Sequence, residues 1–241
     1  IKIEDPSACS TYTVDPITFA PIAGTGTNVS LSDDQLSSGL PIGFNFDFYC
    51  NTYNTFYISS NGFISFDPSA GSGCCTGDPI PDLFSPNNFI ALSWEDYNPS
   101  SGGSINYFTT GVAPNRRLVV NYINVPRFGS TTNVVTGQII LYEGTNVVEV
   151  HTTAVTADGP TTQGIENSDG TSGIAVPGRN SGIWSASNDA FRFSPGIALL
   201  FGPLTYNWIP GFAVSDPTSS NPNGFPQETT TFTVQVNEQG C

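Results

Sequence analysis

Basic side chains are scarce in this chain. Its 241 residues contain 6 Lys and Arg against 20 Asp and Glu, which gives a formal net charge of −14. The few cations are scattered singly apart from Arg116-Arg117, whereas a nucleic-acid-binding protein needs a basic stripe to neutralise phosphates. The composition therefore excludes nucleic acid as a partner. Because 20 acids in 241 residues is a modest number, the net charge reflects the shortage of Lys and Arg.

Long apolar runs are missing as well. No stretch of about 18 apolar residues occurs, so the sequence predicts no membrane span. The first residues, Ile1-Lys2-Ile3-Glu4, lack the charged and apolar segments of a secretory leader. We therefore expect any such leader to have been removed or never included.

Catalytic and zinc-binding motifs are few. The chain has one histidine, His151, and no CxxC, HExxH or GxSxG motif, which disfavours a zinc site and a Ser-His-Asp triad. Glu95 and Asp96 are neighbours at a strand end, so their side chains point to opposite faces and cannot act as the acid pair of a glycosidase. We expect no enzymatic activity within these residues, and we expect His151 to be a surface histidine.

What the chain does contain is typical of an all-β protein. Hydrophobic residues make up 38% and aromatic residues 12%, which supplies enough apolar area for a core. Gly, Pro, Asn or Ser-Thr clusters interrupt the chain about every 8–12 residues, and helical periodicity is nearly absent. We predict a two-sheet antiparallel sandwich, jelly-roll-like, over residues 1–202. Its strands include 42–48, 89–96, 104–109, 118–125, 190–193 and 197–201.

Two hairpins stand out. In the first, Asn61-Gly62 joins two runs of strand formers, and this dipeptide favours a type I′ turn. In the second, residues 138–143 and 146–151 flank Gly144-Thr145. Pairing Glu143 with Asn146 places Leu141 opposite Val148 and Ile139 opposite Val150 on the core side. Gln138, Ile140, Tyr142, Val147, Glu149 and His151 then share the outward face.

Residues 203–241 form a separate pattern. Two strand-like segments, 204–210 and 229–236, flank a stretch rich in Pro, Ser and Asn. A segment of this length is too short to bury a core alone. We favour an incomplete immunoglobulin-like module, whose other strands come from a neighbouring chain or from sequence beyond Cys241, over a segment that docks on the first domain.

The five cysteines are Cys9, Cys50, Cys74, Cys75 and Cys241. Their number in a Thr/Asn/Gly-rich chain fits an oxidising, extracellular setting, with one thiol left over. Cys74 and Cys75 bond to separate partners such as Cys9 and Cys50, which we favour, bond to each other, or stay as free thiols. Sequence does not fix the connectivity.

Calcium is the metal that suits an acidic, loop-rich extracellular sandwich, because it takes oxygen ligands from loops. No other cofactor is indicated. Turn capping is the alternative role for these acids. A glycan site would need exposed aromatic rings, whereas Trp94 fits the core better. The candidate calcium ligands are Asp33, Asp34, Glu95, Asp96, Glu166 and Asp169, and the candidate ring platforms are Tyr97, Tyr107 and Trp184.

Two longer stretches carry a family resemblance. The runs 41–49 and 56–66, with Gly73-Cys74-Cys75-Thr76-Gly77-Asp78, Trp94-Glu95-Asp96 and Gly178-Arg179-Asn180, resemble a recurring β-sandwich module of bacterial secreted and surface proteins, over roughly residues 28–195. Tyr206-Asn207-Trp208, Thr229-Thr230-Thr231-Phe232-Thr233-Val234 and Gly240-Cys241 resemble the end of the immunoglobulin/PKD-like repeats of Bacteroidota surface proteins. Such repeats build gliding-motility adhesins and cargo of the type IX secretion system.

The resemblance implies a non-enzymatic structural or adhesive module at the cell surface. We expect an adhesin or filament subunit that assembles by strand addition with copies of itself or with further domains of the same protein. The alternative is an accessory or carbohydrate-binding domain of a larger secreted enzyme, with surface glycans as partners.

Overall fold

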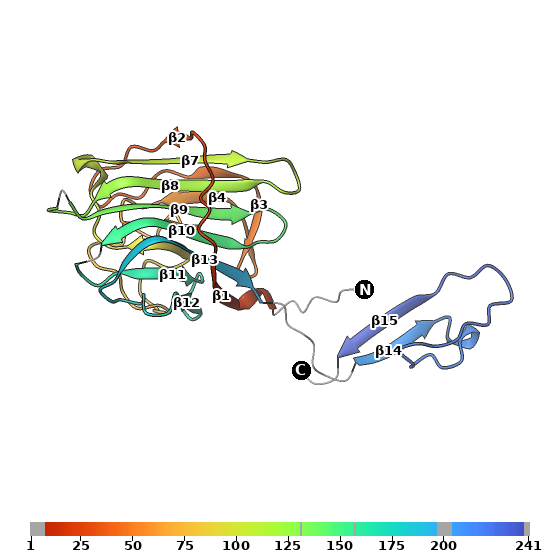
Figure 1. The fold of residues 1–241 in the computed structure, drawn as a ribbon. Coiled ribbons are helices and arrows are strands. Elements are labelled where there is room, and N and C mark those ends of the chain that lie inside the picture. Colours follow the sequence, from red (N-terminus) through yellow and green to blue (C-terminus); the bar gives the residue numbers. More distant parts are fainter. Residues whose placement is uncertain (1–7, 131, 157, 197–203, 239–241) are drawn as a thin grey trace. The chain divides into compact units, whose positions relative to one another are not determined.

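The computed structural model describes residues 8–130, 132–156, 158–196 and 204–238 (Figure 1). They fall into two compact units, one within Pro6–Ile197 and one that contains the tail. The predicted boundary at 202/203, the predicted strand 197–201 and Cys241 lie outside the described residues.

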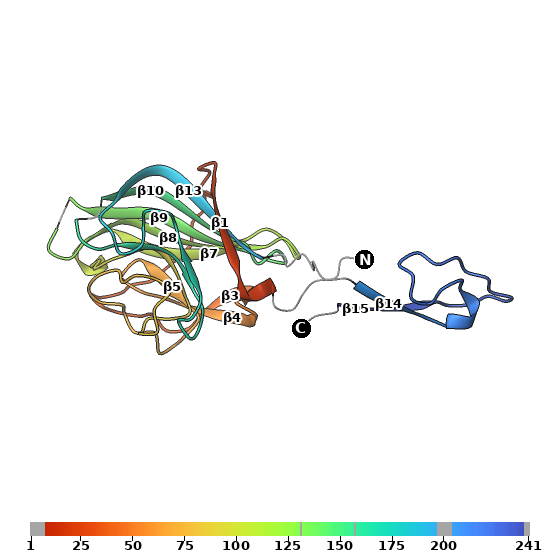
Figure 2. The ribbon, with the colours of Figure 1, turned by 90° about the horizontal axis from the view of Figure 1, so that it is seen from below.

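The first unit is the predicted all-β sandwich, in which every paired strand is antiparallel. Figure 2 shows its two layers. The seven-stranded sheet has the order β1 (Tyr12–Ile17), β13 (Ser185–Pro195), β10 (Val148–Thr156), β9 (Val134–Tyr142), β8 (Arg117–Pro126), β7 (Ser104–Thr110) and β2 (Thr27–Asn28). The six-stranded sheet has the order β12 (Gly173–Ala175), β11 (Thr162–Glu166), β6 (Phe89–Trp94), β5 (Phe63–Ser65), β4 (Asn51–Ile58) and β3 (Leu40–Phe48). Two short 3₁₀ turns, η1 (Ala8–Ser10) and η2 (Pro99–Ser101), accompany them.

The core lies between the sheets and follows from strand alternation. Ile42, Phe44, Phe46 and Phe48 are the buried residues of β3, and every second residue between them is exposed. In the β9–β10 hairpin the predicted register is confirmed, since Leu141 pairs with Val148 and Ile139 with Val150. All four side chains are fully buried.

The Asn61-Gly62 hairpin forms, but its turn is not the predicted type I′. Ser59 N–H donates to the carbonyl of Phe63, so three residues make the turn, and Gly62 has φ +82° whereas Asn61 is not among the residues with positive φ. A three-residue loop of this kind needs one left-handed residue rather than two. Because a Cβ on Gly62 would lie 2.0 Å from the Ser93 carbonyl oxygen, the turn lies directly against β6.

The disulfides differ from the pairing we favoured. Cys9 bonds to Cys50, and Cys74 bonds to Cys75. Cys9 and Cys50 meet because β1 begins beside the β3–β4 turn, where the Tyr12 and Tyr49 rings are 4.7 Å apart. Among the described cysteines, Cys74 and Cys75 are then left to each other, in an exposed loop.

The second unit is a two-stranded sheet of β14 (Leu204–Ile209) and β15 (Thr233–Glu238), with η3 (Gly211–Ala213) between them. The chain that connects the two strands folds back onto β14, where the indole N–H of Trp208 donates to the Ser219 carbonyl at 2.9 Å. Among the side chains described in this unit, only Ala213 is buried. The unit therefore has almost no core of its own.

One segment crosses the outer face of the seven-stranded sheet. β1 and β2 lie at opposite edges of that sheet, so residues 18–26, here called the strap, must pass over the strands between them (Figure 1). In Figure 2 the strap lies on the side away from the six-stranded sheet.

A buried tyrosine links the two layers and gives a first prediction. The Tyr122 hydroxyl on β8 lies 2.8 Å from the carbonyl oxygens of Ser59 and Phe63, and the residue is fully buried. Tyr122→Phe leaves these carbonyls without that donor and should lower the free energy of unfolding by about 1–3 kcal/mol. Urea unfolding followed by Trp fluorescence measures this. Tyr57→Phe, at a partly exposed tyrosine of β4, is the control, and equal stability of both variants would contradict the role of Tyr122.

Candidate functional site

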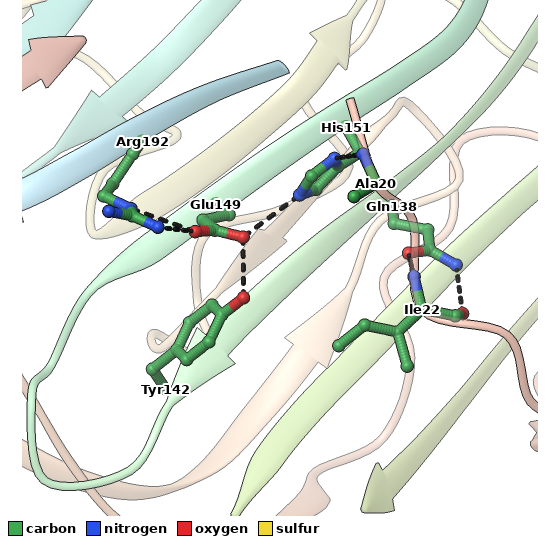
Figure 3. Close-up of polar contacts among 7 residues, drawn as sticks. All are labelled: Ala20, Ile22, Gln138, Tyr142, Glu149, His151 and Arg192. Carbon is green, nitrogen blue, oxygen red and sulfur yellow. Dashed lines mark hydrogen bonds and ion pairs between the residues drawn. The ribbon is translucent and has the colours of Figure 1, made fainter. Parts of the chain in front are cut away.

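A row of polar side chains runs across the seven-stranded sheet under the strap. His151, Gln138, Asn121 and Asn106 are successive cross-strand neighbours on β10, β9, β8 and β7. Ile22 N–H donates to Gln138 Oε1 at 2.8 Å, and Gln138 Nε2 donates to the Ile22 carbonyl at 2.8 Å (Figure 3). The Gln138 side chain thereby pairs one backbone N–H and one backbone carbonyl of the strap, which belongs to no strand or helix at this point.

The strap also contacts the sheet closely at its glycines. A Cβ on Gly24 would lie 2.4 Å from the Phe108 ring, and one on Gly26 would lie 2.4 Å from the Tyr107 carbonyl oxygen. The backbone of the strap is therefore seated directly on β7 at this end.

His151 fixes the other end of the strap. Ala20 N–H donates to His151 Nδ1 at 3.3 Å, so Nδ1 acts as an acceptor and the ring proton belongs on Nε2. His151 Nε2 then donates to Glu149 Oε2 at 3.1 Å. Both ring nitrogens are engaged, as Figure 3 shows.

Glu149 is the centre of a buried polar cluster. Its Oε1 accepts from Arg192 Nε at 2.9 Å and Nη2 at 2.6 Å, and its Oε2 accepts from the Tyr142 hydroxyl at 2.6 Å. Burial acts to raise the pKa of Glu149, but hydrogen bonds from His151, Tyr142 and Arg192 outweigh it and lower the pKa to about 2. Burial and the bond to Glu149 raise the pKa of Tyr142 to about 12.

The expectation that His151 is a surface residue is wrong. The register that places it on the outward face is right, yet His151 is 2% exposed and Glu149 4%. The strap covers this face, and nothing in its sequence has a strand or helix pattern that predicts where it lies. Gln138, Tyr142, Glu149 and Arg192 were therefore not predicted as a cluster. The hairpin register placed Gln138, Tyr142 and Glu149 on one face, but Arg192 comes from β13, outside that hairpin.

Three predicted calcium ligands do converge. Carboxylate oxygens of Asp33, Asp34 and Asp96 lie within 4.8 Å of one another. Burial raises the pKa of Asp33, and Asp34 raises it further; burial and then Asp34 and Asp33 raise the pKa of Asp96. Asp34 also lies near the Cys74–Cys75 disulfide, whose sulfurs are not thiolates and so are not metal ligands.

Asn61 holds this acidic cluster together. Its side-chain amide donates to Asp34 Oδ1 at 2.8 Å, and its Oδ1 accepts from Tyr97 N–H at 2.9 Å. Asn61 is fully buried, so one side chain of the hairpin turn connects the loop of Asp34 to the chain directly after Asp96.

Glu95 takes a different role from Asp96. It is buried and pairs with Arg127, whose Nε lies 2.5 Å from Glu95 Oε1, while Arg127 also pairs with Asp158 at 2.8 Å. Burial raises the pKa of Glu95, and the contact with Arg127 opposes that rise. Glu95 thus belongs to an ion pair with Arg127, whereas Asp96 belongs to the acidic cluster with Asp33 and Asp34.

Glu166 and Asp169 lie in neither of the two groups of metal-capable side chains found among the described residues. Asp169 accepts from the Thr171 N–H and hydroxyl, which lowers its pKa and closes the turn. Glu166 is buried at the end of β11 and accepts from Asp82 N–H at 2.7 Å. Burial raises the pKa of Glu166 to about 8.

The predicted ring platforms do not present free faces. Tyr97 is 2% exposed with its hydroxyl 2.8 Å from Ser93 Oγ, and Arg179 covers the Trp184 ring at 4.6 Å. The prediction is therefore wrong for these two residues. Tyr107 is partly buried and packs against the core, with its ring centroid 5.5 Å from that of Phe56. Trp94 is buried, as expected of a core residue.

Glu166 makes stability depend on pH in a definite direction. Because the pKa of Glu166 in the folded protein, about 8, lies above the ordinary Glu value of 4.5, the stability that its protonated carboxyl contributes is fully present below pH 4.5 and is lost as the pH rises through about 8. Wild type should lose on the order of 1–3 kcal/mol relative to Glu166→Gln across this window. Melting temperatures at several pH values test this, with Glu228→Gln, at an exposed acid of the tail, as control. A constant gap between wild type and Glu166→Gln would contradict the shift.

If the acidic cluster binds calcium, the effect of Asp96→Asn on the melting temperature should differ between EDTA and calcium. In EDTA, Asp96→Asn should melt no lower than wild type, because it relieves repulsion among three carboxylates. In millimolar CaCl₂ wild type should gain stability, by about 2.7 kcal/mol if the ion is present at about 100 times its Kd, and Asp96→Asn should not. Asp78→Asn, an equal charge change at an exposed residue, should keep the gain. An unchanged melting temperature of wild type in calcium would show that these acids bind no calcium.

Comparison with known proteins places the sandwich in a family. A family model described as NIDO related matches residues 11–194, which span β1 to β13 and include the strap, the polar cluster and the acidic cluster. No curated protein and no solved structure gives a significant match. The chain belongs to the NIDO-related family.

Proposed function

We propose that this chain is a non-enzymatic extracellular module of a bacterial cell-surface protein, an adhesin or filament subunit whose tail pairs with a strand of another copy. The tail, residues 204–238, supplies the observation that carries this proposal. Both of its strands are edge strands, and Ala213 is its one buried side chain among those described.

The surface of the tail supports a partner. Ile209 is 45% exposed, Phe212 93% and Phe225 65%. Isolated two-stranded sheets are at best marginally stable in water, and an exposed edge is a template for a further strand. Strand addition would supply the missing hydrogen bonds and cover these apolar side chains.

The polar cluster supports a role without catalysis. His151, the one histidine, uses both ring nitrogens, one for the Ala20 N–H and one for Glu149. A general base needs a free nitrogen within reach of the proton that it takes. The cluster instead serves to hold the strap.

The extracellular setting has independent support. The family match and the two disulfides are consistent with an extracellular or secreted protein. Within the described part of the chain, no helix has the length and apolar character needed to cross a membrane.

A proline in β15 tests the assembly. Gln235→Pro removes a backbone N–H from the strand, so we expect wild type to form larger species as its concentration rises and this variant to stay monomeric in sedimentation velocity. Ser220→Pro, in the exposed connection between the strands, should assemble like wild type. A wild-type chain that stays monomeric at high micromolar concentration, or assembly that survives Gln235→Pro, would sink the proposal.

A further inference from the structure

A groove runs beside the strap on the outer face of the seven-stranded sheet. Its volume is about 840 Å³, within the range of roughly 300–1,000 Å³ that is usual for ligand pockets. Ile17 and Ile22 line it on the side of the strap, and Arg117, Tyr142 and Arg192 line it from the strands. Glu149 and His151 also line it and are almost fully buried.

The groove gathers cationic groups in a chain that has few. Four of the five described arginines have a carboxylate partner, namely Arg116, Arg127, Arg179 and Arg192. Arg117 has no ion pair among the described residues, and its guanidinium lies 5.0 Å from the centroid of the Tyr142 ring. Two of the five arginines thus face one groove.

Arg192 keeps donor capacity toward the groove. Its Nε and Nη2 donate to Glu149, while its side chain stays 48% exposed. Glu149 is ionised and accepts hydrogen bonds from Tyr142, His151 and Arg192. Its negative charge and the positive charge of Arg192 cancel, so this ion pair adds no net repulsion toward an anionic ligand. Asp15, the cross-strand neighbour of Arg192 on β1, does not line the groove. The charge that remains unmatched there is that of Arg117.

The net negative charge of the chain limits how many acidic groups a ligand of the groove can carry. The net charge of −14 repels a polyanion over its whole length. A single carboxylate is affected mainly by charges within the Debye length, about 8 Å at physiological salt. The groove therefore suits a ligand with one acidic group.

The remaining lining suits a sugar ring. Pro16, Ile17 and Ile22 offer apolar surface for a ring face, and the Thr18 hydroxyl beside them offers hydrogen bonds to ring hydroxyls. A sugar acid combines these features in one molecule. We propose that the groove binds a glycan through a single sugar carboxylate held between Arg117 and Arg192. Because it lies in the sandwich, this site can exist whether or not the tail assembles.

The test uses an acidic sugar and its neutral counterpart. Isothermal titration of the full chain with 3′-sialyllactose should show binding, and lactose, which lacks the carboxylate, should bind at least about tenfold more weakly, as expected for loss of a charge-assisted hydrogen bond. Arg117→Ala should weaken sialyllactose binding by a similar factor. A glucuronic acid disaccharide serves as a second acidic probe.

Arg116→Ala is the matched control. It removes the same charge from the adjacent residue, whose guanidinium pairs with Glu143 and does not line the groove. Thermal unfolding of both variants confirms that they fold. Unchanged affinity of Arg116→Ala supports the site. If neither acidic probe binds more tightly than lactose, or if Arg117→Ala and Arg116→Ala bind alike, the groove is not a site for acidic sugars.

Discussion

The hydrogen bonds between the strap and the polar row beneath it keep the outer face of the seven-stranded sheet covered where it would otherwise be exposed to solvent. An antiparallel sheet usually leaves one face to solvent, but here Ile140, Glu149 and His151 on that face are buried. Buried polar groups are costly unless each is paired. Gln138 and His151 meet this requirement by bonding to the strap backbone, and Glu149 meets it through Tyr142, Arg192 and His151. The groove exists because the strap stands above the sheet there.

Local patterns in the sequence predicted the sandwich well and the contacts between distant segments poorly. The alternation of apolar and polar residues predicted the strands, and the predicted register of the 138–151 hairpin matches the paired residues because a one-residue slip would turn its apolar side chains away from the core. The turn at Asn61-Gly62 was wrong, since the fit of Gly62 against β6 decides its geometry. The Cys9–Cys50 bond, the meeting of Asp96 with Asp33 and Asp34, and the path of the strap depend on long-range packing that a single sequence does not encode locally.

The sandwich and the tail divide the functional features between them. The NIDO-related sandwich carries the groove with Arg117 and Arg192 and, separately, the acidic cluster organised by Asn61. The tail has two edge strands and almost no core. The glycan binding proposed for the sandwich and the strand pairing proposed for the tail use different parts of the chain, so the two proposals can be tested separately.

Hydrogen exchange at the strap tests its attachment most directly. If the polar row holds the strap, the Ile22 amide of wild type should exchange far more slowly than an unstructured amide, and Gln138→Ala should speed it at least about tenfold while core amides such as Val150 keep their rates. Gln227→Ala, an exposed glutamine of the tail, should change nothing. An Ile22 amide that exchanges freely in wild type, or that ignores Gln138→Ala, would contradict the strap as the organiser of this face.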